Sequence, residues 1–117
     1  MSTLKLASAS LLAVASFGCA STGQQIDTRG LTLVEENHAT VEHGAQRYIL
    51  DSFIVPFQQP YYIRVQREAP GPLSSAEAVS IAKAYIEPRG CTQPLVRRPD
   101  LDRVNSDKTQ WLIGIEC

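Results

Sequence analysis

Three cysteines give this 117-residue chain its clearest capacity for covalent chemistry. Cys91 and Cys117 lie in its last third, with no Cys-x-x-Cys spacing and no histidine near either of them. Reactive or metal-binding thiols usually show one of these features. In an oxidising compartment we therefore expect the two residues to form a disulfide. The chain-entropy model gives such a bridge a stabilisation of roughly 3 to 4 kcal/mol.

The third cysteine, Cys19, ends a segment that has the organisation of an export signal. Lys5 gives residues 1–18 a positive end, an apolar run follows, and small Gly18 precedes Cys19. Residues 16–19 (Ser-Phe-Gly-Cys) resemble the lipobox of bacterial lipoproteins. The resemblance implies that residues 1–18 are a signal peptide and that Cys19 is lipidated, for example with palmitate. Ala20 follows where Asp would retain a lipoprotein in the inner membrane, which implies an outer-membrane lipoprotein facing the periplasm.

Two other cleavage sites stay open. Signal-peptidase cleavage after Ala20 would discard Cys19 and release a soluble periplasmic or secreted protein. A cut after Ala15 would leave an apolar run near the lower limit of about seven residues. No later segment approaches the ~20 apolar residues of a transmembrane helix, so the membrane contact that we predict is the N-terminal lipid anchor.

The other residue types used in catalysis and metal binding lack a recognisable spacing. His38 and His43 are five positions apart, which points them to opposite faces of a strand. The segment from Asp100 to Asp107 lacks the glycine and the closing glutamate of a calcium loop. Asp51 has no second carboxylate at a fixed spacing for acid–base work. We therefore predict a protein that is not an enzyme and holds no metal or cofactor; a small hydrolase that uses Asp51 or His43 is an alternative.

Binding is the function that the remaining residues indicate. Exposed aromatic and arginine side chains are the usual anchors of protein interfaces. The candidate binding surface comprises Phe57, Tyr62, Arg64, Arg97 and Arg98. The formal net charge is −1, and aspartates interrupt the most basic segment, 89–108, so a nucleic-acid partner is not expected. The sequence thus predicts a binding or structural module with an unidentified envelope protein as its partner.

The elements that must position these residues are strands, then a helix, then a strand. Residues 19–30 are polar and predict a flexible tether, and residues 31–117 predict one domain. Its expected strands are Ala39–His43, Gln46–Val55, Tyr61–Gln66 and Trp111–Cys117, with a tight turn at Gly44-Ala45. Leu31–Glu35 alternates only weakly and is a candidate for a further short strand. Alternation predicts that Tyr61, Ile63 and Val65 face the core and that Tyr62, Arg64 and Gln66 face water. In the last strand Trp111, Ile113 and Ile115 are expected inward.

The helix has the clearest sequence signals. Ser74-Ser75-Ala76-Glu77 matches a capping box, in which the Glu77 carboxylate would reach back to the Ser74 amide. An apolar stripe follows, formed by Ala78, Ile81, Ala82, Tyr85 and Ile86. Pro88 and Gly90 are expected to end the helix. The fold class is therefore α+β: an antiparallel sheet of about four strands with one helix packed on one face.

One further resemblance concerns this helix and the last strand. The sequence LSSAEAVSIAKAYI, followed by an aromatic-led strand from Trp111 to Glu116, resembles the helix and strand of PepSY-type extracytoplasmic domains. Such domains are associated with peptidase regulation. The resemblance implies an alternative function as a peptidase-regulating domain.

Overall fold

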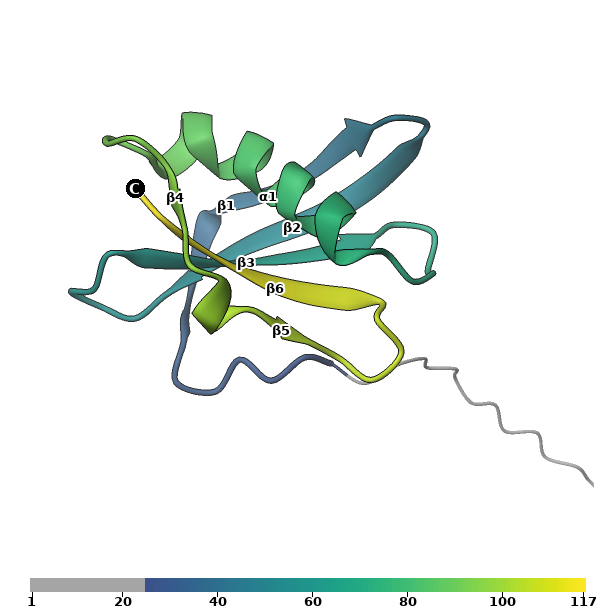
Figure 1. The fold of residues 1–117 in the computed structure, drawn as a ribbon, viewed down its shortest axis with the longest axis horizontal. Coiled ribbons are helices and arrows are strands. Elements are labelled where there is room, and N and C mark those ends of the chain that lie inside the picture. Colours follow the sequence, from purple (N-terminus) through teal and green to yellow (C-terminus); the bar gives the residue numbers. More distant parts are fainter. Residues whose placement is uncertain (1–24) are drawn as a thin grey trace, which may run out of the picture.

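The computed structural model describes residues 25–117 as one helix packed on a six-stranded antiparallel sheet (Figure 1). The predicted signal peptide and Cys19 lie outside the described residues. The elements are β1 (Thr32–His43), β2 (Gln46–Ile54), β3 (Pro60–Arg67), α1 (Ser75–Gly90), β4 (Val96–Arg97), a 3-10 turn η1 (Pro99–Leu101), β5 (Arg103–Val104) and β6 (Gln110–Glu116). The α+β class with one helix is confirmed, whereas the sheet has more strands than the four expected.

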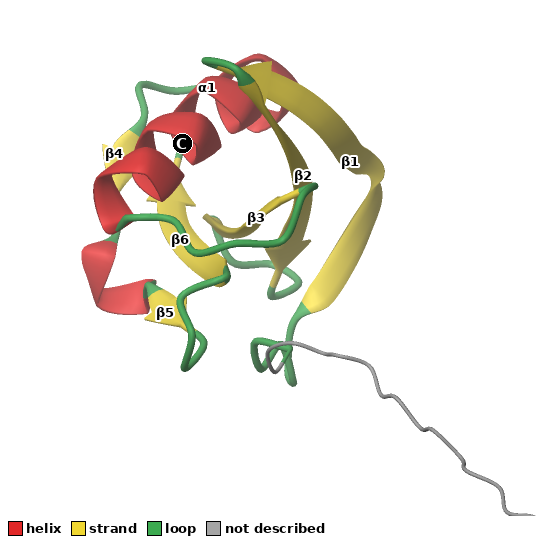
Figure 2. Ribbon diagram, turned by 90° about the vertical axis from the view of Figure 1, so that its right-hand side faces the viewer, coloured by secondary structure: helices red, strands yellow, loops and turns green. Residues whose placement is uncertain are grey.

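The sheet order is β1-β2-β3-β6-β4, and β5 also pairs with β6. The two-residue strands β4 and β5 therefore lie one after the other along the same edge of β6, opposite Glu116 and Leu112 respectively. Neither is long enough to show an alternating pattern, which is why the sequence did not indicate them. Figure 2 shows how strongly the sheet curves beneath α1.

Strand β1 is continuous where one strand and a candidate for a second were expected. The turn after it is confirmed: Gly44 has a positive φ of 65°, and His43 pairs with Gln46. Farther back the register shifts, because Val34 lies opposite Ser52 while Ala39 lies opposite Leu50. The extra residues of β1 form a bulge, which redirects side chains locally without ending the strand.

Helix α1 begins as expected and continues past Pro88 to the expected end at Gly90. The Ser74 hydroxyl accepts a hydrogen bond from the Glu77 amide at 3.1 Å. The Glu77 carboxylate does not complete the capping box but accepts a hydrogen bond from the Tyr48 hydroxyl of β2. Pro88 lies inside the last turn, so the helix continues to Gly90.

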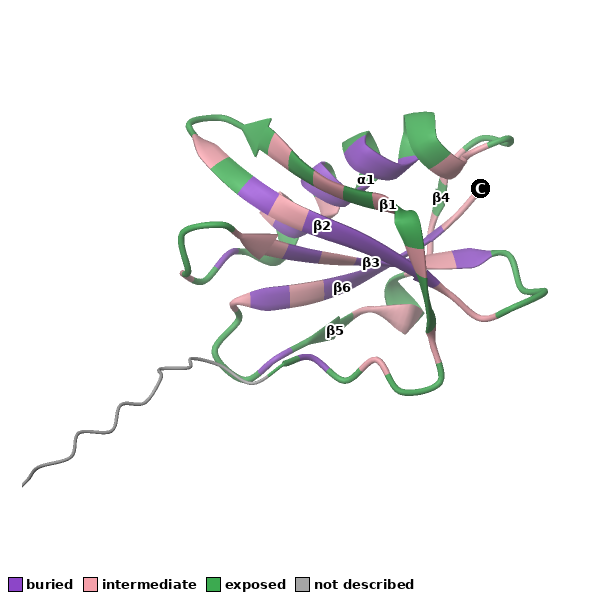
Figure 3. Cartoon of the chain, turned by 180° about the vertical axis from the view of Figure 1, so that it is seen from behind, coloured by how far each residue is buried: buried purple, intermediate pink, exposed green. Residues whose placement is uncertain are grey.

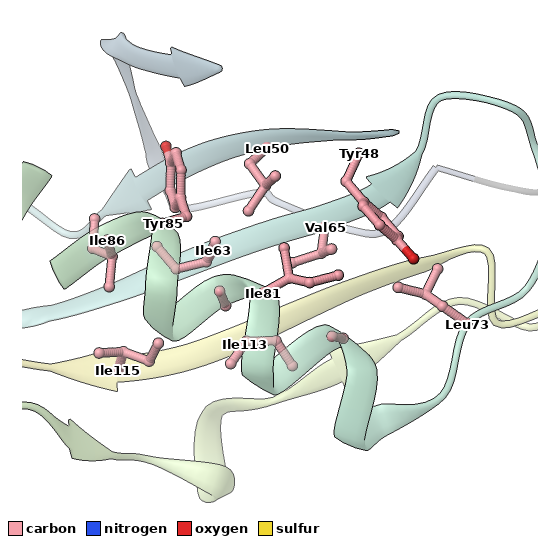
Figure 4. Packing of buried hydrophobic residues seen from close by; sticks show 12 residues of the cluster. Tyr48, Leu50, Ile63, Val65, Leu73, Ile81, Tyr85, Ile86, Ile113 and Ile115 are labelled. Atoms are coloured by element: carbon pink, nitrogen blue, oxygen red, sulfur yellow. The ribbon is translucent and has the colours of Figure 1, made fainter. Parts of the chain in front are cut away.

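The helix and the concave face of the sheet enclose the main core (Figure 4). The expected helix stripe is buried throughout, and so are the inward residues Ile63 and Val65 of β3 and Ile113 and Ile115 of β6. Trp111 is half-buried on the same face, where its indole N–H donates to the Leu73 carbonyl at 2.8 Å. No helix in residues 25–117 is long and apolar enough to cross a membrane.

The opposite face of the sheet carries a second, smaller core, which the sequence did not predict. It is formed by Ile26, Phe53, Tyr62 and Leu112. The expectation that Tyr62 faces water is therefore wrong, since only 7% of it is exposed. Consecutive residues of β2, β3 and β6 are buried (Figure 3), and since successive side chains of a strand point to opposite faces, both faces of the sheet carry buried side chains.

Ile26 explains this second core and corrects the boundary of the tether. Its side chain is 6% exposed, and its backbone N–H donates to the Gln110 side-chain oxygen at 3.0 Å. Residues 25–30 were expected to belong to a flexible tether because Ile26 is their only large apolar residue. The buried isoleucine, its hydrogen bond to Gln110, and a hydrogen bond from Arg103 Nη1 to the Asp27 carbonyl at 3.0 Å hold the segment on the sheet.

We expect the domain to need this segment. A chain that begins at Leu31 should be less stable than one that begins at Gln25 by about 2 kcal/mol, the burial free energy of one isoleucine. Urea denaturation measures the difference, and Ile26→Ala in the longer chain should reproduce most of it. Equal denaturation midpoints for the two chains would show that Ile26 contributes nothing.

Candidate functional site

The five residues expected to form a binding surface do not lie together. Tyr62 is buried in the second core. Arg64 is paired with Asp51 at 2.9 Å and lies over the Phe53 ring. Arg97 is paired with Asp102 at 2.6 Å. Arg98 pairs with Asp100 at 2.8 Å and with Glu116 at 3.5 Å. The side chains of four of the five residues are therefore buried or paired within the fold. Of the five, only Phe57 has the exposure that a binding anchor requires.

Phe57 occupies a backbone position that normally belongs to glycine. The Gln58 N–H donates to the Val55 carbonyl at 2.9 Å, which closes a β-turn with Pro56 and Phe57 at its centre. Phe57 has a φ of 70°. Proline followed by a residue of positive φ is the arrangement of a type II turn, whose third position favours Gly or Asn. The side chain is completely exposed, at 107% of its reference area, so no burial compensates the strain of the backbone.

A groove of about 590 Å³ lies directly beside this turn. We call it the end groove. It is lined by Ile54, Gln58, Gln59, Tyr61, Gly90, Thr92, Gln93, Pro94, Val96, Glu116 and Cys117. One wall is the β2–β3 loop and the other is the segment between α1 and β4. Figure 1 shows both loops and the C-terminal residue at one end of the molecule.

The walls of the end groove are firmly held. Cys91 and Cys117 are paired as the sequence predicts, with their Cα atoms 4.9 Å apart, inside the ~4.4 to 6.8 Å range of disulfides. The N–H groups of Thr92 and Gln93 donate to the Cys117 carbonyl at 3.3 and 3.2 Å. On the opposite side the Tyr61 hydroxyl donates to the carbonyl of Gly90 at 3.1 Å. A Cβ atom at this glycine would lie 2.6 Å from that hydroxyl oxygen, so only glycine permits the contact.

The chemistry of the end groove is polar, and its lining has no cationic side chain. The side chains of Gln58, Gln59, Thr92 and Gln93 form no hydrogen bond with any residue of the described part. The groove's one charged side chain, Glu116, lies 3.5 Å from Arg98, which also pairs with Asp100. Each glutamine offers two donors and an acceptor. The groove can therefore donate and accept several hydrogen bonds at once, and its lining contains no cationic side chain.

A second polar cluster surrounds Asp51 on β2, away from this groove. Asp51 is 6% exposed, and its two carboxylate oxygens contact His38 Nδ1 at 2.7 Å and Arg64 Nη2 at 2.9 Å. Burial acts to raise the pKa of the Asp51 carboxyl, but the hydrogen bonds from Arg64 and His38 outweigh it and hold that pKa below its usual value. The β1 bulge makes this contact possible by turning His38 towards Asp51. The bulge is not visible in the sequence, so this pairing was missed.

The bulge is tied to the helix as well. The Tyr85 hydroxyl lies 2.5 Å from the Asn37 carbonyl and 2.8 Å from the Ser52 hydroxyl, and the Asn37 amide donates to Ser52 at 3.3 Å. Burial raises the pKa of Tyr85, so this phenol stays protonated and can donate. These contacts connect β1, β2 and α1, and they satisfy buried polar atoms. In residues 25–117, no group of three or more His, Cys, Asp or Glu side chains could hold a metal ion.

No protein-family model, curated protein or solved structure matches the chain. The resemblances to lipoprotein signals and to PepSY-type domains therefore stay predictions. In residues 25–117 the strained and exposed Phe57 and the adjacent end groove are the features that most specifically indicate a binding site.

Proposed function

We propose that this protein is a small, exported, lipid-anchored module of the cell envelope, without enzymatic activity, that binds a partner through Phe57 and the end groove. The observation that carries the proposal is the combination of strain and exposure at Phe57. A residue other than glycine or asparagine in this conformation costs of the order of 1 kcal/mol, and strained backbone is concentrated at functional sites. Because the Phe57 side chain is fully exposed, it gains no burial free energy within the folded chain that would offset this cost.

The position of the groove suits a tethered protein. The described chain starts beside Gln110, at the beginning of β6, where Ile26 is bonded. The end groove contains Glu116, at the end of the same strand. Seven residues of strand separate the two sites by roughly 20 Å. A lipid anchor that precedes residue 25 would therefore leave the groove at the far end of the domain.

Phe57→Gly tests whether this residue serves binding rather than folding. Glycine relieves the positive φ, so we expect stability to rise by about 1 kcal/mol, or about 4 to 8 °C in Tm. Binding of the native partner should weaken at the same time. Lys108 is the matched control, because it also has a positive φ (62°) on an exposed site. Lys108→Gly should raise stability without changing binding.

The binding itself is measured by photo-crosslinking in the native envelope. A photoreactive residue at position 58 should form an adduct, whereas one at Lys83, on the outer face of α1, should not. Phe57→Gly should reduce the adduct at position 58. Equal labelling from positions 58 and 83, or no labelling from either, would contradict the proposed binding surface.

The lipid anchor is tested separately. Metabolic labelling with a palmitate analogue should mark the wild-type protein and not Cys19→Ser, because the thiol is the site of lipid attachment. Mass spectrometry of the mature N-terminus is the second measurement. An unlabelled wild-type protein that begins at Ser21 would show that cleavage occurs after Ala20 and that the protein is soluble.

A further inference from the structure

We propose that the ligand of the end groove is an uncharged glycan chain, with Phe57 stacking on a sugar ring at the rim. This inference rests on the proposed binding function and names the chemical class of the partner. It departs from the sequence prediction of an envelope protein as partner. Three features of the groove support it: its lack of cationic side chains, its unpaired amides, and the aromatic side chain beside it.

The lack of cationic side chains disfavours anionic ligands. Residues 52–63, which supply the first wall, contain no Asp, Glu, Lys or Arg, and neither do residues 90–96, which supply the second. Glu116 at the base lies 3.5 Å from Arg98, which pairs more closely with Asp100 at 2.8 Å. Phosphates and other anions are normally bound by arginine, lysine or helix N-termini. An anionic ligand would find no such partner in the walls of this groove and would be repelled by Glu116.

The polar groups match hydroxyl-rich ligands. The free amides of Gln58, Gln59 and Gln93 and the Thr92 hydroxyl can each donate and accept. Sugar hydroxyls and acetamido groups also do both, so neighbouring groups on a ring can be matched by amides on both walls. The groove volume of about 590 Å³ falls within the ~300 to 1,000 Å³ range of small-ligand sites and leaves room for more than one ring.

The aromatic side chain supplies the apolar contact that a sugar requires. One face of a pyranose ring presents C–H groups, which pack on aromatic rings. Phe57 immediately precedes Gln58 of the groove and has no packing partner in residues 25–117. Its position on a tight turn limits the entropy lost when a ligand covers it.

An extended peptide fits these features less well. One common mode of binding an extended peptide adds a strand to an exposed sheet edge, with pockets for alternate side chains. The sheet edge at the groove is β4, which has only two residues, Val96 and Arg97. The groove also shows no deep apolar pocket of the kind that a peptide side chain would fill, since polar side chains predominate in its walls.

A titration followed by NMR tests the inference on the full mature chain. The probes are three neutral tetrasaccharides: tetra-N-acetylchitotetraose, cellotetraose and maltotetraose. We expect at least one of them to shift the amide signals of residues 57–59 and 92–93, and not those of the outer helix face around Lys83. Gln93→Ala and Phe57→Gly should each weaken the affinity by about tenfold, as loss of one anchor does. Gln25→Ala, at an exposed glutamine away from the groove, should leave it unchanged.

Two comparison ligands separate this inference from the proposed function. Tetragalacturonic acid, an anionic chain, should bind more weakly than the neutral sugars, and a capped neutral hexapeptide should not bind. If none of the neutral sugars binds, or if the peptide binds more tightly, the glycan inference is overturned. Crosslinking from position 58 then decides about the binding function independently, because it reports any partner present in the envelope.

Discussion

Cys91→Ser is expected to lower the Tm by about 10 to 25 °C, because the bridge to Cys117 closes a 26-residue separation and contributes roughly 3 to 4 kcal/mol on the chain-entropy model. Cys117 follows directly after β6, a central strand that pairs with β3, β4 and β5. Without the bridge the end of this strand can fray. The loss of ordered structure should therefore be greatest at the end of β6, which lines the end groove.

Thermal unfolding followed by circular dichroism measures this effect, and reduction of the wild type should give the same Tm as the variant. The matched control is the reduced variant, which has no bridge left to lose and should not change further. The Cys91→Ser protein should also bind its ligand more weakly, since Thr92 and Gln93 depend on the Cys117 carbonyl for their position. An unchanged Tm, or two free thiols in protein isolated from the envelope, would contradict the structural role of the bridge.

The sequence predicted the parts of the fold that depend on neighbouring residues. The helix stripe, the Ser74 cap and the turn at Gly44 each follow from spacings of a few positions. The inward residues of β3 and β6 followed from alternation in the same way. The cysteine pairing was also predictable, because the alternatives for a thiol pair have recognisable motifs that this chain lacks.

The sequence could not predict features that depend on distant residues. Tyr62 has the alternation of a solvent-facing residue, and it is buried because Ile26 crosses the same face and bonds Gln110, 84 positions later. Likewise, Asp51 and His38 have no pattern in common, and a bulge brings them together. Arg64, Arg97 and Arg98 were interpreted as free anchors because their partners lie on other elements or in turns.

Phe57 could have been singled out more sharply from the sequence. Pro56-Phe57 precedes two glutamines and Pro60, and a type II turn at this point places Phe57 where Gly is usual. The conflict between residue and conformation is a local signal, and conflicts of this kind are expected at functional sites. The groove itself was not predictable, because its walls come from segments about 35 residues apart that meet only through β3 and β6.

Asp51→Asn is expected to destabilise the domain by about 3 kcal/mol, because it leaves Arg64 charged and largely buried without its counter-ion. The Arg64 side chain is 20% exposed, and its Nε atom already has no hydrogen-bond partner in residues 25–117. The amide of asparagine preserves the shape of the side chain and removes its charge. His38 would lose its charged acceptor as well, which loosens the bulge of β1.

The exposed pair between Asp100 and Arg98 is the matched control. Its N–O distance, 2.8 Å, is similar to that of the buried pair, but the Asp100 side chain is 62% exposed. Asp100→Asn should therefore lower the free energy of unfolding far less than Asp51→Asn does. The double variant Asp51→Leu/Arg64→Met should be more stable than Asp51→Asn alone, because it removes both buried charges. If Asp51→Asn and Asp100→Asn lowered the free energy of unfolding equally, burial would not be the reason for the large effect expected at Asp51.

The pH dependence of the same pair gives an independent measurement. Since folding lowers the pKa of Asp51, its stabilisation is present above the unfolded-state value of about 3.9 and is lost as the pH falls through the lower folded-state value. Urea midpoints of wild type and Asp51→Asn should therefore differ by a constant amount near neutral pH, and the difference should shrink below about pH 4. The wild type should converge on the variant, because protonation removes the same charge as the substitution. A difference that persists undiminished at pH 2 would mean that packing or hydrogen bonding, rather than the charge of Asp51, stabilises this face of the sheet.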